Sequence, residues 1–254
     1  MGNTLESLLR WTGRELEPAA VVRPAALLVA DSWLVDEGYE RAADAHWARF
    51  RGSCAQLGAE PAQLRRFEAA ARAALPAQGR WFPRVELTAD GLALRLRGAP
   101  GAGACDQARV IVGARGDPRR HPRRKGPDLE LLARLRAQAH GQGADELLLC
   151  GDDGRLYEGA LSSLLWWEGD ALCTTPDEHA LPGVTRALLL ARARERGVEL
   201  RVRAPLPAEL EGRETWLTSA LHGIRVVSAW LSPRIEAGAA TRAPAWREEL
   251  DRDG

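Results

Sequence analysis

The chain has 254 residues, of which 45% are hydrophobic, and its 35 basic and 35 acidic side chains give a formal net charge of zero. This length and hydrophobic content are enough for one large or two modest globular domains with a real core. The balanced charge disfavours nucleic acid and anionic membranes as partners. The N-terminal residues lack the pattern of a signal peptide, and no apolar run approaches the roughly 20 residues of a membrane span, so we expect a cytoplasmic protein.

The first half of the chain predicts an α+β domain with antiparallel hairpins. An apolar run over 25–30 predicts a short buried strand that Asp31 ends, and a second strand follows over 32–35. Apolar spacing predicts amphipathic helices over 42–57 and 61–75. Alternating apolar positions over 82–97 predict a strand pair around a turn.

A domain boundary is expected near residue 115. The segment 99–104 is rich in Gly, Pro and Ala, and the segment 113–126 is rich in Gly, Pro and Arg, which is typical of connections between domains. We therefore expect domains over 1–115 and 116–254. Within this zone, residues 119–125 form the strongest local basic run, and its isolation favours a solvated loop.

The second half is rich in strands and carries two longer predicted helices, and the tail from Ala237 onward predicts a loop and a short polar helix. The first helix covers 128–140, and the second begins at the Pro182-Gly183 pair and ends at about residue 196, before Gly197. Predicted strands and hairpins lie between and after these helices, over 146–157, 164–174, 198–202, 214–218 and 224–230. Cysteines at 54, 105, 150 and 173 and five scattered histidines show neither disulfide nor metal-ligand spacing, so we predict buried thiols and no metal site.

Lysine occurs once, at Lys125, whereas the other 34 basic side chains are arginine. An amine can lose its proton when desolvated and condense with a carbonyl, which a guanidinium cannot do. The composition alone is consistent with a required amine or with a general preference for arginine. The residues that follow Lys125 favour the first interpretation.

Several motifs follow Lys125 in a fixed order. Gly143-Ala144-Asp145-Glu146 surrounds a point 20 residues after the lysine, and Glu158 stands 33 residues after it at the start of Glu-Gly-Ala-Leu-Ser-Ser-Leu-Leu. Thr175-Pro176, Pro182-Gly183-Val184-Thr185-Arg186 and the segment 218–227 come next. Over about 125–227 this order resembles the fold-type IV pyridoxal-phosphate enzymes, or class IV aminotransferases.

The resemblance implies an α/β (α+β) architecture of two domains with pyridoxal 5'-phosphate in the cleft between them. Lys125 would form the Schiff base, and Glu158 would face the pyridine nitrogen to keep it protonated. Val184 and Thr185 at a helix start would bind the phosphate together with Ser219 and Ala220. In the first half, His46-Trp47-Ala48-Arg49-Phe50 resembles a family segment whose arginine binds the phosphate, so Arg49 takes that role by resemblance.

The chain departs from the family pattern at two positions. Ser163 stands where the family usually has Asn, and Asp128 stands where Asn is common three residues after the lysine. The first change affects hydrogen bonding near the cofactor. Because Ala30-Asp31-Ser32-Trp33 also lacks a clear counterpart to the family's first strand, the substrate pocket cannot be transferred.

The expected function is that of a 4-amino-4-deoxychorismate lyase of folate biosynthesis, which releases 4-aminobenzoate and pyruvate. This preference comes from the Leu221-His222-Gly223-Ile224-Arg225 segment and the compact length. The alternative is a transaminase of D-amino or branched-chain amino acids with a 2-oxo acid. An inactive binding protein of the same fold and an arginine-rich binder of acidic partners are rivals from other classes. The family resemblance further implies a homodimer acting on a small amino substrate.

Overall fold

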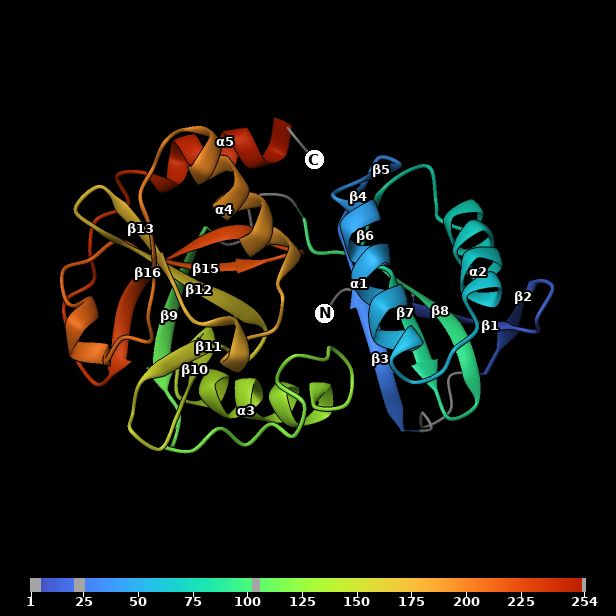
Figure 1. Ribbon diagram of the computed structural model, residues 1–254, viewed down its shortest axis with the longest axis horizontal. Coiled ribbons are helices and arrows are strands. Elements are labelled where there is room, and N and C mark those ends of the chain that lie inside the picture. The colour runs from blue at the N-terminus through green and yellow to red at the C-terminus, as the bar shows by residue number, and fades with distance from the viewer. Residues whose placement is uncertain (1–5, 21–25, 102–105, 253–254) are drawn as a thin grey trace. The chain divides into compact units, whose positions relative to one another are not determined.

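The computed structural model describes residues 6–20, 26–101 and 106–252 (Figure 1). The expectations for the first five residues, Ala25, residues 102–104 and Cys105 fall outside the described residues. The chain divides into two compact units, Met1–Ala104 with Arg124–Pro127, and Cys105–Arg123 with Asp128–Gly254.

The first unit is built on an antiparallel sheet of five strands in the order β2-β1-β8-β7-β3. These strands are β1 (Glu6–Trp11), β2 (Leu16–Ala19), β3 (Leu27–Ser32), β7 (Arg84–Thr88) and β8 (Gly91–Arg97). A smaller sheet joins β4 (Val35–Asp36), β5 (Tyr39–Glu40) and β6 (Arg80–Trp81). The helices are α1 (Ala43–Ala55) and α2 (Pro61–Ala73).

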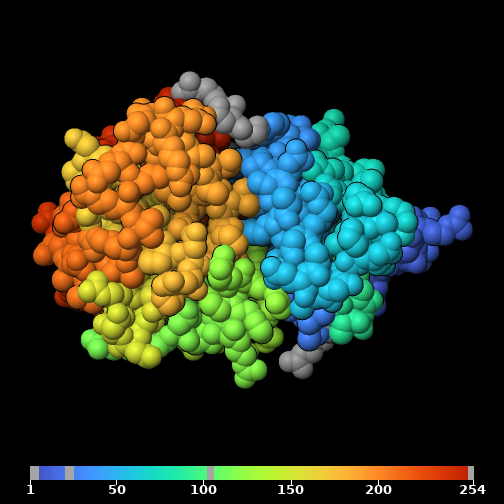
Figure 2. Space-filling view, viewed as in Figure 1, coloured from blue at the N-terminus to red at the C-terminus, as the bar shows by residue number. Residues whose placement is uncertain are grey.

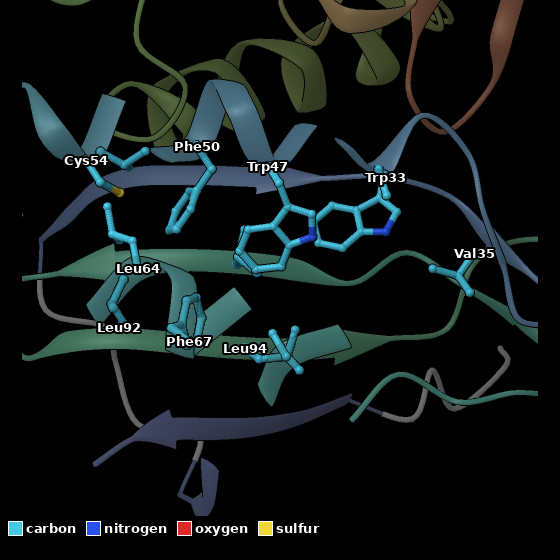
Figure 3. Close-up of a cluster of buried hydrophobic side chains, with 13 residues drawn as sticks. Trp33, Val35, Trp47, Phe50, Cys54, Leu64, Phe67, Leu92 and Leu94 are labelled. Carbon is cyan, nitrogen blue, oxygen red and sulfur yellow. The ribbon is translucent and has the colours of Figure 1, made fainter. Parts of the chain in front are cut away.

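Aromatic side chains form the centre of the first unit's core. Trp33 and Trp47 lie with ring centroids 5.3 Å apart, and Phe67 approaches Trp47 edge-on at 5.9 Å. Figure 3 shows these rings together with Leu92 and Leu94 of the sheet. Such ring pairs add to the free energy gained by burying their area. The polar side of α2, including Arg65 and Arg66, remains exposed, and Figure 2 shows this cyan segment at the surface.

The structure confirms most of the elements predicted in the first half and corrects one. Both helices and the pair β7–β8 are present as predicted. The prediction that a strand ends before Asp31 is wrong, because β3 continues through Asp31 and Ser32. A charged residue fits inside this strand because its carboxylate is paired, as described below. The first hairpin, β1 and β2, was not predicted.

The second unit contains a mixed sheet of eight strands in the order β11-β10-β9-β16-β15-β12-β13-β14. Because β11 also pairs with β12, six of these strands close into a ring. The strands are β9 (Gln107–Val112), β10 (Glu146–Cys150), β11 (Leu156–Gly159), β12 (Ser162–Glu168), β13 (Ala171–Thr174), β14 (Leu200–Val202), β15 (Thr215–Ser219) and β16 (Gly223–Ser232). The helices are α3 (Leu129–Gly141), α4 (Val184–Glu195) and α5 (Ala243–Arg252), with short 3-10 turns at Asp177–His179 and Pro207–Leu210.

The connection between the units crosses the zone where the boundary was expected. Residue 115 falls inside the second unit, because the preceding strand β9 pairs in parallel with β10 and β16. The chain then returns to the first unit at Arg124–Pro127. There the N–H of Ala30 on the edge strand β3 donates to the Lys125 carbonyl at 2.8 Å.

Gly126 is required for this close approach. Its φ of 142° is one that side chains disfavour, and a Cβ atom there would lie 2.8 Å from Val29 Cα.

Three cysteines in the described part of the chain, Cys54, Cys150 and Cys173, are buried, as predicted, and are free thiols. Across residues 6–20, 26–101 and 106–252, no cluster of His, Cys, Asp and Glu has a geometry suited to a metal ion. No helix in these same ranges combines the length and apolar character needed to cross a bilayer.

Candidate active site

A buried carboxylate organises the polar side chains of the first unit. Asp31 on β3 is fully buried, and Arg49 on α1 binds it through two parallel contacts of 2.7 Å, from Nε to Oδ2 and from Nη2 to Oδ1. His46, one helical turn before Arg49, places Nδ1 2.8 Å from Oδ1. The N–H of Ser32 donates to the same oxygen at 2.8 Å. Asp31 is thus held by both α1 and its own strand.

The charges of this cluster fix its protonation states. Burial alone would raise the pKa of Asp31, but the Arg49 guanidinium and the bonds from His46 and Arg49 hold it well below its usual range. Burial lowers the pKa of His46, although its bond to Asp31 opposes this effect. At neutral pH Asp31 is therefore ionised where it binds the Arg49 guanidinium.

Lys125 lies next to this cluster. Its carbonyl accepts from Ala30, the residue before Asp31, and the lysine itself is half-buried. Burial lowers the pKa of its amine to about 8, while Asp31 opposes that change and the cations Arg49, Arg97 and Arg84 reinforce it. Roughly a tenth of the amine is therefore neutral at pH 7. A neutral lysine amine is the form that can attack a carbonyl.

Replacing Asp31 by Asn should lower the pKa of Lys125 below about 8, because the carboxylate is the group that raises it. The lone lysine makes the measurement direct. Reductive methylation with a carbon-labelled reagent gives one lysine resonance besides the α-amine, and its shift can be followed with pH in the cofactor-free chain. Asp90→Asn is the control, since Asp90 forms an exposed pair with Arg10 in the same unit. An unchanged or raised Lys125 pKa in Asp31→Asn would contradict the assignment.

The same substitution should destabilise the first unit by about 3–5 kcal/mol, because it removes the charge of the fully buried Asp31 from its pair with Arg49. The pH dependence has a defined sign. A carboxylate with a depressed folded-state pKa stabilises the fold above its unfolded pKa of about 4, and this contribution is lost as pH falls through the folded value. Urea denaturation of both proteins should show the difference at pH 7 and a smaller one at strongly acidic pH. Equal stability at pH 7 would show that the pair contributes nothing.

In the second unit, Glu158 occupies a buried position on β11. Both of its hydrogen bonds from the described residues end on Oε1, one from Arg119 Nη1 and one from the N–H of Leu181 at 3.0 Å. Burial raises the pKa of Glu158 to about 7, although Arg119 and the Leu181 N–H lower it. The carboxylate therefore titrates near neutrality and can hold or release a proton there.

Glu158 lies in a row with two hydroxyl residues. Ser163 on β12 pairs directly with Glu158 on one side and with Thr218 on β15 on the other. Directly paired residues point to the same face of a sheet, so the three side chains share one face. Thr218 Oγ1 is buried and has no hydrogen-bond partner in the described structure. A buried hydroxyl without a partner indicates a site for a missing polar group.

The N-terminus of α4 lies at this row. Gly183 is its N-cap, and a Cβ atom on Gly183 would come 2.5 Å from Ser163 Oγ. Val184 and Thr185, both buried, form the first turn, and the first N–H groups of a helix can bind an anion. The helix packs against β15, which ends at Ser219, followed by Ala220. The structure thus places Val184 and Thr185 at the start of a helix that packs against β15, and Ser219 ends that strand. Their binding of phosphate stays a prediction.

The two departures from the family pattern have local explanations. Ser163 faces the α4 cap, where Gly183 leaves little room for a larger side chain. Asp128 caps the preceding loop, since its carboxylate accepts the backbone N–H groups of Arg120 at 3.2 Å and His121 at 2.8 Å. Asp128 therefore has a structural role, and Ser163 lies where space is limited.

Sequence reasoning missed two residues. Asp31 was interpreted as the end of a strand, and its pairing with Arg49 was not predicted. Arg119 was part of a basic run that was expected to be solvated. That expectation is wrong for Arg119, whose side chain is 3% exposed because three acceptors surround it. Asp117, two residues before Arg119, was the available sign of a local ion pair.

Solved structures share this fold across almost the whole chain. A hypothetical aminotransferase from Mycobacterium tuberculosis in its pyridoxal-phosphate-bound form has a TM-score of 0.79 at 22% identity, covering 96% of this chain and 97% of that one. The branched-chain amino acid aminotransferase from Escherichia coli also has a TM-score of 0.79, at 16% identity and 97% and 93% coverage. A Legionella pneumophila protein provisionally assigned as a 4-amino-4-deoxychorismate lyase has 0.71, at 18% identity and 89% and 91% coverage.

Because these sequence identities are low, the structural likenesses establish the fold and nothing more. No curated protein matches the sequence. The profile of the family described as amino-transferase class IV matches residues 28–230, which is most of the chain. Asp31, Arg49, Lys125, Glu158, Thr185 and Ser219 all lie within that match. The chain therefore belongs to the class IV aminotransferase family.

Proposed function

We propose that Lys125 and Glu158 are the catalytic residues of this class IV aminotransferase-family enzyme, whose cofactor is pyridoxal 5'-phosphate. The observation that carries the proposal is the row of Glu158, Ser163 and Thr218 that leads to the N-terminus of α4. A carboxylate that titrates near neutrality and a helix N-terminus with adjacent hydroxyls match a ring nitrogen and a phosphate group. The residues present therefore fit this cofactor.

Each end of the cofactor has assigned residues. Val184, Thr185, Ser219 and Ala220 would bind the phosphate through backbone N–H groups and hydroxyls. Arg49 stays a candidate for the same phosphate, although its guanidinium already forms a two-contact pair with Asp31. Lys125 supplies the amine, and it follows Arg119, the contact of Glu158, by six residues in the sequence.

When bound, pyridoxal phosphate supplies an aldehyde that condenses with amines and a ring that stabilises negative charge on the substrate carbon. The Lys125 amine, with a pKa of about 8, is suited to take a proton from that carbon and to return it. The Glu158 carboxylate would hold the ring nitrogen by its charge. Asp31 binds Arg49 through two contacts and raises the pKa of the Lys125 amine.

The finer activity proposed is that of a 4-amino-4-deoxychorismate lyase, with 4-aminobenzoate and pyruvate as products. The Leu221-His222-Gly223-Ile224-Arg225 segment and the likeness to the Legionella protein support it. The likeness to the branched-chain aminotransferase supports a transaminase as second candidate. We also propose a cytoplasmic location and a homodimeric assembly. Light scattering of the purified protein would test the dimer.

The deciding experiment supplies the purified enzyme with 4-amino-4-deoxychorismate alone, and separately with L- and D-amino acids plus pyruvate or 2-oxoglutarate. A lyase forms 4-aminobenzoate and pyruvate without any 2-oxo acid acceptor. A transaminase forms a new keto acid and requires the acceptor. A protein that binds cofactor but converts no substrate would instead favour the inactive binding protein.

A further inference from the structure

Arg119 is a buried guanidinium shared by three acceptors in the second unit. Its Nε and Nη2 bind the Asp117 carboxylate, at 2.9 Å to Oδ1 and 2.7 Å to Oδ2. Nη2 also donates to the carbonyl of His179 at 2.7 Å, and Nη1 donates to Glu158 Oε1. Asp117 therefore fixes the plane of the guanidinium with Nη1 pointed at Glu158.

We propose that Arg119 is a positioning residue that keeps Glu158 ionised, so that the proton shared by Glu158 and the cofactor ring nitrogen stays on nitrogen. This inference rests on the proposed role of Glu158 and adds a residue that acts through it. The basic run 119–125 had suggested only a solvated loop.

The ionic surroundings of Glu158 single out Arg119. Two guanidinium groups face it, Arg119 from the loop after β9 and Arg186 from α4, and Asp117 lies behind Arg119. Arg186 directs its donors elsewhere, to Thr174 Oγ1 and the Thr175 carbonyl at 2.7 Å each and to the exposed Asp177. Arg119 is thus the guanidinium in direct contact with the Glu158 carboxylate.

The direction of the effect follows from charge and distance. In a buried site, desolvation favours the uncharged arrangement, with the proton on the carboxyl oxygen and a neutral ring nitrogen. A guanidinium in contact with the carboxylate attracts the charged oxygen strongly. It repels a protonated ring nitrogen on the far side of that carboxylate less, because charge–charge interactions weaken with distance. Without Arg119 the proton therefore moves from nitrogen to Glu158, and no electron transfer is involved.

The main test compares Arg119→Met with Arg119→Lys in the full chain. In the cofactor-free protein, carbon NMR of labelled glutamate follows the Glu158 carboxyl with pH, and Glu158→Gln assigns its resonance. With cofactor labelled at the ring nitrogen, nitrogen NMR reports whether that nitrogen is protonated. Arg203→Met is the matched control, because Arg203 forms another arginine–glutamate pair, with Glu168, in the same unit.

The expected result is a Glu158 pKa raised by about one unit or more in Arg119→Met, roughly a tenfold gain in proton affinity. The ring-nitrogen resonance should move toward the unprotonated position. Arg119→Lys should largely restore both values, and Arg203→Met should change neither. Since Asp117 loses its partner in Arg119→Met, the double variant Asp117→Asn/Arg119→Met covers the case in which the single variant does not fold.

Three results would overturn the inference. One is an unchanged Glu158 pKa in the folded Arg119 variants, and another is an unchanged ring-nitrogen resonance in those variants while Glu158→Gln shifts it. Either leaves the role of Glu158 intact. If Glu158→Gln itself leaves the ring nitrogen unchanged, the proposed function of Glu158 fails, and the inference fails with it.

Discussion

Replacing Lys125 by Ala is expected to abolish turnover, with a loss of at least roughly 10²–10⁴-fold from the missing acid–base group alone. The chain contains no other lysine, so no neighbouring side chain can replace its amine. Lys125→Arg should be equally inactive although it keeps the positive charge, because a guanidinium stays protonated and does not condense with an aldehyde. Turnover of the substrate identified above is the measurement.

Borohydride reduction gives an independent readout, since it fixes a cofactor that is bound to an amine. In the unsubstituted chain the label should map to the peptide that contains Lys125, and in both variants that label should be lost. The α-amine of Met1 is the remaining amine, and peptide mapping distinguishes it. Turnover retained in Lys125→Ala, or a label in the unsubstituted chain that maps to the N-terminal peptide instead of the Lys125 peptide, would show that the amine was assigned wrongly. The aromatic core lies on other elements, so the variants should fold normally.

Periodic patterns were the part of the fold that the sequence predicted well. The helix over Ala43–Ala55 repeats buried side chains at His46, Trp47, Phe50 and Cys54, which is the spacing of one helical face. By contrast, β1 has one buried residue and β2 has none, so their alternation is weak. Local propensity could not have predicted that hairpin, because pairing with β8 stabilises it.

The sequence could indicate candidate site residues where the proposed chemistry requires one type of side chain. Lys125 is distinctive by composition, and Glu158 and Thr185 by their order along the chain. Asp31 and Arg119 were missed because their roles depend on partners 18 and 39 residues away in the sequence. A charged residue in an apolar run predicts the end of a strand only when no partner meets it in the fold.

The return of Arg124–Pro127 to the first unit could not be predicted either. Nothing in Arg-Lys-Gly-Pro indicates an edge-strand contact, and the glycine-rich surroundings favoured a plain linker. The contact needs the bare backbone of Gly126 against Val29. This placement puts Lys125 beside Asp31, where burial lowers the pKa of its amine and the Asp31 carboxylate opposes that change.

Glu158→Gln is expected to bind the cofactor yet turn over two to four orders of magnitude more slowly, because a buried charge opposite the ring nitrogen is lost. Cofactor binding should survive, since the residues proposed to bind the phosphate, Val184, Thr185 and Ser219, are unchanged. The fold should survive as well. A glutamine oxygen can still accept the Leu181 N–H, and Arg119 keeps Asp117 as its charged partner.

The measurement is a cofactor titration of each protein followed by turnover at saturation, which separates affinity from rate. Glu168→Gln is the matched control, because Glu168 also pairs with an arginine of the second unit but lies at the far end of β12 from Ser163. Its rate should equal that of the unsubstituted chain. Thr185→Val should show the reverse pattern, with weaker cofactor binding and a nearly normal saturated rate. A near-normal saturated rate in Glu158→Gln would mean that the ring nitrogen does not depend on this carboxylate, and Glu158 would then be a structural partner of Arg119.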